Sequence, residues 1–357
     1  MKKILILSNS LRAGGAEKQS IILASVLQKE YDVTLVIFNK NDIDPKLDNL
    51  IRSLKIKILI LHGNIISNAI KLLYLIKQRK IDIIISYLAR TNFLNAFIGK
   101  ISGVKIRVGG IRNSYMSNYK MLFQRFLHNN LLTCSISNSY RGKYELERKG
   151  FKGEKIYVIQ NAFIGKYYMK TKINNNITYI LSVGRFVAQK DYITAIKSFE
   201  IALNECFKKN HTIKYLILGY GEKKKEIELY LLNHKIKNVE IIENPKNLEK
   251  YFMNADIFLS TSLFEGFSNS IMEAMAYSLP IIATNVGDNS YLIKDNYNGF
   301  LVNVGDYHDI GRKIVYLVLN KDIRIQMGLN SYFIIKNNFT IDNFKVRYLE
   351  LLKDLND

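Results

Sequence analysis

The chain has 357 residues, 48% of them hydrophobic, and a formal net charge of +21. Single cores stop growing at roughly 250–300 residues, so this length predicts two domains. The two cysteines, Cys134 and Cys206, exclude a disulfide framework, and no apolar stretch approaches the roughly 18 residues that a membrane span needs. The start, Met1–Asn9, has an apolar run too short for a signal peptide and predicts a strand, so we expect a cytoplasmic protein.

The positive charge is concentrated in the first half of the chain. Residues 1–165 hold 27 Lys and Arg against 10 Asp and Glu, whereas residues 166–357 hold 25 against 21. A basic half suits nucleic acid, an anionic lipid surface or a phosphorylated substrate. A bias of composition without a partner is the alternative, but such a bias would affect both halves equally.

Apolar runs and amphipathic segments alternate through the first half. The predicted strands are Lys3–Leu7, Asp32–Phe38, Ile56–Leu61, Asp82–Ser86, Lys105–Gly109, Leu132–Ile136 and Lys155–Ile159. The predicted helices are Ala16–Lys29, Ser67–Lys80, Asn92–Ser102, Asn118–Asn129 and Asn138–Lys149. Continuous apolar strands between helices are typical of a parallel sheet covered on both faces.

The second half repeats this alternation after a polar segment, Gln160–Ile177, which we interpret as a linker. The predicted strands are Tyr179–Val183, Ile213–Leu218, Val239–Ile242, Asp256–Ser260 and Pro280–Thr284. The predicted helices are Tyr192–Glu205, Glu222–Asn233, Leu248–Met253, Ser270–Tyr277 and Asp306–Asn320, with further amphipathic pieces ending at Asp342–Leu352. The sequence therefore predicts two doubly wound Rossmann-like domains that face each other across a cleft.

Two glutamates eight residues apart, Glu265 and Glu273, are the most informative pair. The spacing alone is weak, because chance supplies about one such pair in a chain of this composition. Its position is stronger, since Glu265 lies in a loop after a buried strand and Glu273 lies in the helix that follows. Parallel α/β folds bind ligands at such junctions, and two carboxylates can each hold a diol.

Two cations follow the first strand of the second half. Gly184 ends that strand, and Arg185 and Lys190 lie in the loop before the next helix. An arginine fork and a lysine point charge can share one diphosphate. Two solvated loop cations are the alternative.

Glycines follow two other strands. Gly219 and Gly221 stand between a strand and a helix, where they permit close approach of a base or phosphate, with a tight turn as the equal alternative. Gly14 and Gly15 open the first predicted helix, where backbone N–H groups suit an anion. The full dinucleotide fingerprint is missing there, so no NAD site is expected.

Taken in chain order, these motifs resemble the retaining glycosyltransferases of family 4, which have the GT-B fold. The resemblance covers most of the second half. It implies an acceptor-binding domain at 1–165, a nucleotide-sugar donor domain at 166–335, and a final helix within 336–357 that crosses back to the first domain.

The resemblance also assigns roles. Arg185 and Lys190 would hold the donor diphosphate, Glu265 would face the donor sugar, and Glu273 would bind the ribose. Backbone N–H groups around Phe267–Ser270 would meet the phosphates. The implied catalytic residues are Arg185, Lys190 and Glu265, and the implied donor-binding residues are Gly15, Gly184, Gly219, Gly221, Phe267, Ser268, Asn269, Ser270 and Glu273. Four acceptor contacts are expected in the first domain: Arg90, Asn92, Arg112 and Asn113.

The chain departs from the family pattern at two places. Members often carry a histidine after the strand at Asp82–Ser86, where this chain has Tyr87–Asn92, and many carry a glutamate near 286–291, where it has none. No metal and no cofactor are expected. Asp42-Ile43-Asp44 matches a metal-binding Asp-x-Asp, but it precedes Pro45 in a polar segment, which favours a solvated turn.

The resulting prediction is a retaining glycosyltransferase of bacterial surface-polysaccharide type. It would move a hexose or N-acetylhexosamine from a nucleotide sugar, expected to be a UDP-sugar, to a glycan or polyprenyl-diphosphate-linked acceptor. The segment Tyr115–Leu127 mixes aromatic, apolar and basic residues, so we expect peripheral binding to the anionic inner face of the cytoplasmic membrane, with packing into the first core as the alternative. A sugar-nucleotide epimerase or glycogen-synthase-like polymerase of the same fold, and a nucleic-acid-binding protein using the basic half, are the alternative functions. No nucleic-acid partner is expected, because no RNA-binding motif is present.

Overall fold

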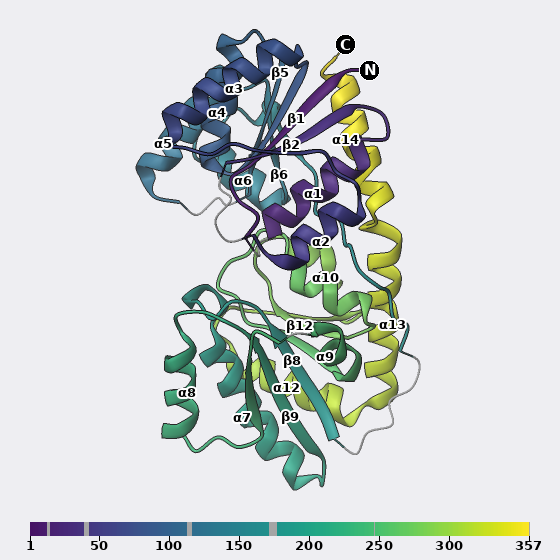
Figure 1. Ribbon diagram of the computed structural model, residues 1–357. Coiled ribbons are helices and arrows are strands. Elements are labelled where there is room, and N and C mark those ends of the chain that lie inside the picture. Colours follow the sequence, from purple (N-terminus) through teal and green to yellow (C-terminus); the bar gives the residue numbers. More distant parts are fainter. Residues whose placement is uncertain (13–14, 39–42, 113–115, 171–176, 246, 357) are drawn as a thin grey trace. The chain divides into compact units, whose positions relative to one another are not determined.

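The computed structural model describes residues 1–12, 15–38, 43–112, 116–170, 177–245 and 247–356 (Figure 1). The chain forms two compact units, Met1–Ala162 with Ile341–Asp357, and Phe163–Thr340. Each unit is built on one parallel sheet with helices on both faces, which confirms the prediction of two doubly wound Rossmann-like folds.

The first unit holds a seven-stranded parallel sheet in its described part, in the order β3-β2-β1-β4-β5-β6-β7. Its strands are β1 (Lys3–Ser8), β2 (Asp32–Ile37), β3 (Ile58–Ile60), β4 (Ile83–Tyr87), β5 (Ile106–Ile111), β6 (Cys134–Ser137) and β7 (Ile156–Val158). The chain first adds strands on one side of β1 and then on the other. The switch point therefore lies between β1 and β4, which pair in parallel.

Helices of the first unit cover the two faces of this sheet. They are α1 (Gly15–Leu27), α2 (Pro45–Ser53), α3 (Ile65–Arg79), α4 (Ala89–Ile101), α5 (Asn118–Phe126), the π-helical turn η1 (Leu127–Leu131), α6 (Tyr140–Arg148), the 3-10 turn η2 (Gly153–Lys155) and α14 (Ile341–Asp354). Leu72 and Leu75 of α3 and Leu94 of α4 pack on Leu5 and Ile84 of the sheet. Figure 1 shows α3, α4 and α5 together on one side of the sheet, and α1 and α14 on the other.

Helix α14 completes the first unit from the far end of the chain. It packs against α1, and Lys345 forms a 2.7 Å ion pair with Glu30. The buried Tyr348 hydroxyl lies 3.3 Å from that of Tyr87 at the end of β4. The chain passes into the first unit at Ile341, a few residues after the predicted boundary at 336.

The second unit holds a six-stranded parallel sheet in its described part, in the order β10-β9-β8-β11-β12-β13. Its strands are β8 (Ile177–Val183), β9 (Thr212–Gly219), β10 (Val239–Glu243), β11 (Ile257–Ser260), β12 (Ile281–Thr284) and β13 (Gly299–Val302). The switch point lies between β8 and β11, where Ile180 pairs with Ile257.

Successive residues of these strands point to opposite faces and feed two separate cores. Leu181 and Leu218 pack under α10 and α13, whereas Ile180 and Ile217 pack under α7 and α12. The helices are α7 (Tyr192–Lys208), α8 (Lys224–Asn233), α9 (Leu248–Asn254), α10 (Asn269–Ala276), α11 (Asn289–Leu292), α12 (Tyr307–Leu319) and α13 (Lys321–Asn338), with the 3-10 turn η3 (Ala188–Lys190) before α7.

The structure corrects three sequence-based expectations. Helix α2 and strand β13 were not predicted, and the helix expected over Asn118–Asn129 ends at Phe126 and continues as a π-helical turn. In the described residues no helix combines the length and the apolar character needed to cross a membrane.

Candidate active site

Two loops of the second unit leave adjacent strands at its switch point. Gly184–Asp191 follows β8, and Thr261–Ser268 follows β11. The carboxyl ends of parallel strands on either side of a switch point diverge and leave a crevice for ligands. The Arg185 loop and the Glu265 loop are therefore neighbours.

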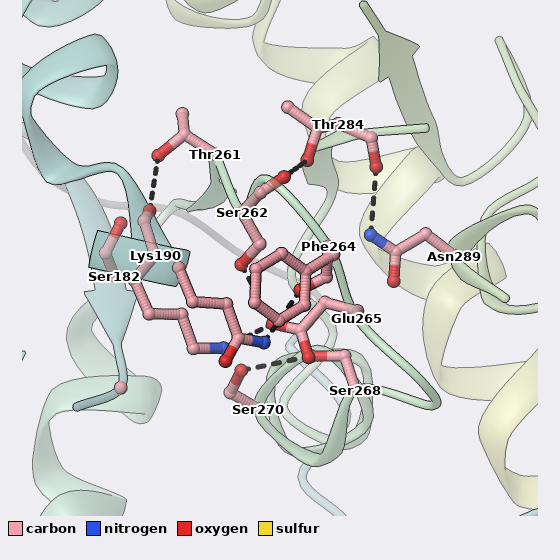
Figure 2. Close-up of polar contacts among 12 residues, drawn as sticks. Ser182, Lys190, Thr261, Ser262, Phe264, Glu265, Ser268, Ser270, Thr284 and Asn289 are labelled. Atoms are coloured by element: carbon pink, nitrogen blue, oxygen red, sulfur yellow. Dashed lines mark hydrogen bonds and ion pairs between the residues drawn. The ribbon is translucent and has the colours of Figure 1, made fainter. Parts of the chain in front are cut away.

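Hydrogen bonds join the two loops directly (Figure 2). Thr261 Oγ1 donates to the carbonyl oxygens of Lys190 (3.1 Å) and Asp191 (2.8 Å). The backbone N–H of Leu263 donates to Gln189 O (2.8 Å), and Gln189 Nε2 donates to Phe264 O (2.7 Å). These bonds fix the backbone on both sides of Lys190.

The side chains of Lys190 and Glu265 form an ion pair across the two loops. Lys190 Nζ lies 2.5 Å from Glu265 Oε1, and the side chains are 18% and 11% exposed. Ser262 Oγ donates to the same oxygen (2.8 Å), and Thr284 Oγ1 donates to Ser262 O (2.6 Å), as Figure 2 shows. Within the described residues, Glu265 Oε2 accepts no hydrogen bond, so one carboxylate oxygen is available to a ligand hydroxyl.

Arg185 lies on the same loop as Lys190 and has no protein partner among the described residues. Its side chain is exposed and forms no hydrogen bond or ion pair within the described part of the chain. The next residue, Phe186, is fully buried, and its N–H donates to Tyr220 O (2.7 Å). An anchored backbone therefore carries a free cation, which suits the binding of a phosphate group.

Gly219 and Gly221 allow the loop after β9 to pack on the loop after β8. A Cβ at Gly219 would lie 1.8 Å from Gly184 O, and one at Gly221 would lie 2.5 Å from Phe186 O. Gly221 also has a φ of +149°. These contacts favour the interpretation that the two glycines form a tight turn. Their proposed approach to the base of a bound nucleotide stays a prediction.

The backbone of Gly184 is fixed by a hydrogen bond from the buried Tyr192 side chain. Tyr192 Oη donates to Gly184 O (3.0 Å), and burial raises the pKa of Tyr192 well above its ordinary value. The phenol therefore keeps its proton and remains a hydrogen-bond donor at neutral pH.

Helix α10 begins directly after the Glu265 loop, with Ser268 as its N-cap and Asn269 as its first residue. The first N–H groups of a helix have no intrahelical acceptor and suit an anion. The Phe267 side chain is buried against Phe339, with ring centroids 5.2 Å apart, so only its backbone can meet a ligand. Ser268 Oγ and Ser270 Oγ lie 3.3 Å apart, and Glu273 is half-buried in the second turn of α10.

A third loop, after β12, supports the Glu265 loop and was missed from the sequence. Gly287 has a φ of +55°, and a Cβ there would lie 2.3 Å from Glu265 O. The N–H of Asp288 donates to Gly266 O (3.0 Å), and the buried Asn289 donates from Nδ2 to Thr284 O (2.9 Å). The only sequence signal for this loop is the tripeptide Val286-Gly287-Asp288 after a strand. Such a tripeptide is a common turn signal and does not indicate a site.

Comparisons with known proteins place this unit in a family. Residues 166–332, nearly all of the second unit, match the family model described as glycosyl transferases group 1. The second unit belongs to the group 1 glycosyl transferases.

Relatives of this chain include two bacterial proteins. The capsular polysaccharide biosynthesis glycosyltransferase CapM of Staphylococcus aureus is 30% identical over 193 residues, 54% of this chain and about half (49%) of that protein. A Campylobacter jejuni enzyme is 24% identical over 99% of both chains and is named as an α-1,4-N-acetyl-D-galactosaminyltransferase acting on a GalNAc-containing diphosphoundecaprenol glycan.

A solved structure of similar fold is Anabaena HepE in complex with UDP and glucose. It aligns over 99% of this chain and 100% of that one, with a TM-score of 0.84 and 18% identity. The likeness shows the fold, and it confirms the GT-B architecture that the resemblance implied.

The first unit carries the expected acceptor residues in different settings. Arg90 is exposed in the first turn of α4, directly after β4 at the switch point. Arg112 lies over the Tyr87 ring (4.4 Å from its centroid), and its Nη1 donates to Asn161 Oδ1 (2.7 Å). Gly15 begins α1 and is exposed. Gly14 and Asn113 lie outside the described residues.

The acceptor role expected for Asn92 is wrong. Asn92 is 1% exposed, and its Nδ2 donates to Gly110 O and to Gln124 Oε1 (3.0 Å each). Its Oδ1 accepts from Ser86 Oγ (2.8 Å) and from the N–H of Gly110 (3.2 Å). Because α4 begins three residues earlier than predicted, Asn92 turns into the core and joins α4 to β4 and β5.

The structure also revises the Asp-x-Asp segment. Asp44 accepts from the N–H of Lys46 (2.7 Å) and caps helix α2, whereas Asp42 lies outside the described residues. Among the residues that the structure describes, no group of three His, Cys, Asp or Glu side chains is arranged to hold a metal ion.

Proposed function

We propose that this protein is a metal-independent, retaining glycosyltransferase that uses a UDP-sugar and a lipid-linked acceptor. The observation that carries the proposal is the switch point of the second unit, where Lys190 pairs with the Glu265 carboxylate and the same loop carries the unpaired Arg185. Arg185 and Lys190 suit a diphosphate, and Glu265 offers a free oxygen to a sugar hydroxyl.

The donor assignment is further supported by likeness. The HepE structure of the same fold holds UDP and glucose. An Escherichia coli relative, 23% identical over 96% of this chain and 93% of its own length, is named as a galactosyltransferase that uses UDP-Gal and a diphosphoundecaprenol-linked acceptor. We therefore expect UDP as the leaving group, a hexose or N-acetylhexosamine as the transferred sugar, and a polyprenyl-diphosphate-linked glycan as the acceptor.

In the proposed reaction the bond between the anomeric carbon and the β-phosphate oxygen breaks. A bond from the acceptor oxygen forms on the same face of the sugar, and the acceptor proton passes to the departing phosphate oxygen. Negative charge grows on the diphosphate as the first bond breaks. Arg185 and Lys190 stabilise that charge, and Glu273 binds the ribose hydroxyls at the other end of the donor.

Transfer to a polyprenyl-diphosphate-linked acceptor takes place at a membrane, because the polyprenyl chain is anchored there. We therefore expect peripheral association with the inner face of the cytoplasmic membrane, driven by the basic first unit.

A panel of nucleotide sugars tests the donor. UDP-glucose, UDP-galactose and their N-acetyl forms are incubated with the protein, beside the ADP- and GDP-sugars, and the melting temperature and free nucleotide are measured. We expect one UDP-sugar to raise the melting temperature and to be hydrolysed slowly. The Arg185→Ala variant should lose hydrolysis, whereas Lys214→Ala, which removes an exposed cation of the same unit, should retain it.

Further measurements test the acceptor, the stereochemistry and the metal. Transfer to a short polyprenyl-diphosphate-linked sugar should give a product whose anomeric proton coupling matches that of the donor, and EDTA should leave the rate unchanged. An epimerised nucleotide sugar, an inverted product, or activity lost in EDTA and restored by manganese would each contradict part of the proposal.

A further inference from the structure

Helices α3, α4 and α5 lie together on one side of the first unit and carry no carboxylate, whereas the neighbouring α6, whose Leu146 packs on Met121 of α5, carries Glu145 and Glu147. From Ile83 to Tyr144 the sequence has 62 consecutive residues without Asp or Glu, although these make up 31 of the 357 residues. Helix α3 has none either. Asp82 lies in sequence between α3 and Ile83, and its carboxylate accepts a hydrogen bond from the backbone N–H of Lys3 (2.8 Å). The helices of the other side, α1, α2 and α14, all contain acidic residues.

The outer surface of α5 is apolar. Met121 and Gln124 point into the unit, whereas Tyr119, Leu122, Phe123 and Phe126 are 42–69% exposed. The sequence left two alternatives for this segment, membrane contact and core packing. One side of α5 packs into the core, and the opposite side, which is also apolar, is exposed to solvent.

This surface continues onto the neighbouring helices. Phe93 and Phe97 of α4 are half-buried, and Phe93 lies 5.8 Å from Phe123 of α5 between ring centroids. On α3, Ile66, Ile70 and Tyr74 stand four residues apart and are 63–68% exposed. Figure 1 shows the three helices side by side on one side of the sheet.

Exposed cations lie among these side chains. Lys77 of α3, Lys100 of α4 and Lys120 of α5 are exposed, and no anionic side chain of their own helices neutralises them. Exposed apolar groups beside cations, without carboxylates, match a bilayer that presents phosphate headgroups above acyl chains. A folded protein partner would leave the missing carboxylates unexplained.

We propose that the outer faces of α3, α4 and α5, the α3–α5 face, bind an anionic phospholipid bilayer. The proposal rests on the proposed function, because it names the surface that brings the enzyme to a lipid-linked acceptor. Leu122 and Phe126 enter the boundary between headgroups and acyl chains, and Lys77, Lys100 and Lys120 bind the headgroup phosphates.

Vesicle flotation tests the proposal with the full-length protein. Vesicles of phosphatidylglycerol and phosphatidylethanolamine are compared with vesicles of phosphatidylcholine at low and high salt. The protein should float with the anionic vesicles at low salt only, because salt screens the headgroup charge.

Two variants and two matched controls locate the surface. Leu122→Ser with Phe126→Ser should weaken binding more than tenfold, since each side chain no longer buries its apolar area in lipid. Lys77→Glu with Lys120→Glu should weaken it by about fivefold or more for each lysine. The controls are Phe207→Ser with Leu232→Ser, which are 80% and 72% exposed in the second unit, and Lys209→Glu with Lys237→Glu.

Donor hydrolysis without lipid separates this proposal from the proposed function. The face variants should hydrolyse the UDP-sugar like the wild type. A wild type that floats but shows no donor turnover would refute the transferase and leave the membrane face supported. No flotation at low salt, equal loss in the control variants, or binding to single-stranded RNA in place of vesicles would overturn the membrane face.

Discussion

Lys190 Nζ lies 2.5 Å from Glu265 Oε1, on loops that leave adjacent strands of one sheet. The pair makes the two cations of the candidate site unequal, because Lys190 is neutralised before any ligand arrives and Arg185 is not. A donor diphosphate therefore meets Arg185 as a free charge and must share Lys190 with Glu265.

Removing the charge of Glu265 should strengthen the binding of UDP. Glu265→Gln keeps the shape of the side chain but frees Lys190 for the phosphates, so we expect UDP to bind about tenfold more tightly, which is ~1.4 kcal/mol. Calorimetric titration measures the affinity. Glu240→Gln, an exposed glutamate of β10, is the control, and weaker UDP binding in Glu265→Gln would contradict the competition.

Arg185 should act on turnover and Glu273 on binding. Arg185→Ala should lower the rate of donor hydrolysis by about 10²–10³, the usual effect of removing one group that stabilises transition-state charge. Glu273→Ala should raise the dissociation constant of the nucleotide sugar because the ribose loses its acceptor. Steady-state kinetics separate the two, and wild-type turnover in Arg185→Ala would discard the diphosphate role.

Gly219 should tolerate no side chain. Gly219→Ala places a methyl group 1.8 Å from Gly184 O, so the loops after β8 and β9 must separate. We expect a lower melting temperature together with loss of UDP-sugar binding. Gly305→Ala is the matched control, since a Cβ there meets nothing within 4 Å and its φ of +78° costs only about 1–2 kcal/mol. Unchanged donor binding in Gly219→Ala would refute the coupling of the two loops.

Stability should fall in mild acid through His128. The ring is fully buried, with Nδ1 2.8 Å from Ser135 Oγ and Nε2 3.0 Å from Lys152 O. A carbonyl only accepts, so Nε2 carries the proton and Nδ1 accepts from Ser135. Burial, aided by the charge of Lys155, lowers the pKa of His128 below its ordinary value of 6.5.

The sign of this effect follows from the pKa difference. The unfolded chain takes up a proton near its ordinary pKa, and the folded chain does so only at lower pH. The stabilising contribution is thus complete above pH ~6.5 and is lost as the pH falls from there towards the folded-state value. Urea unfolding between pH 7.5 and 5 measures it. His128→Gln should flatten this dependence, because the other four histidines are exposed, and an equal slope in the variant would count against it.

The strands were predictable because parallel strands buried on both faces form apolar runs. Helix α2 was missed although its sequence carries helix signals, since Leu47, Leu50 and Ile51 have helical spacing and Asp44 with Pro45 is typical of a helix start. Strand β13 has only four residues, and Gly299 precedes its apolar ones. A run of three apolar residues is too short to distinguish β13 from a loop.

The candidate site was predictable as far as its two loops, because Lys190 and Glu265 each follow a strand of the same parallel sheet. It was not predictable where a contact depends on tertiary packing. The approach of Gly287 to Glu265 O joins distant loops, and Leu88, at a φ of +74°, is a bulky residue in a conformation that favours glycine. The inward turn of Asn92 depended on where α4 begins, and helix starts are the least certain feature of any sequence pattern.

The return of α14 to the first unit has a consequence for biogenesis. Tyr87 is buried partly by Tyr348, 261 residues further along the chain. During synthesis the seven-stranded sheet emerges early but keeps one flank uncovered until residues 341–354 have left the ribosome. The second unit is contiguous from Phe163 to Thr340, so it can be complete before the first. We therefore expect the first unit, although it is synthesised first, to complete its fold after the second. The sheet surface that α14 later covers should be a target for chaperones that bind nascent chains.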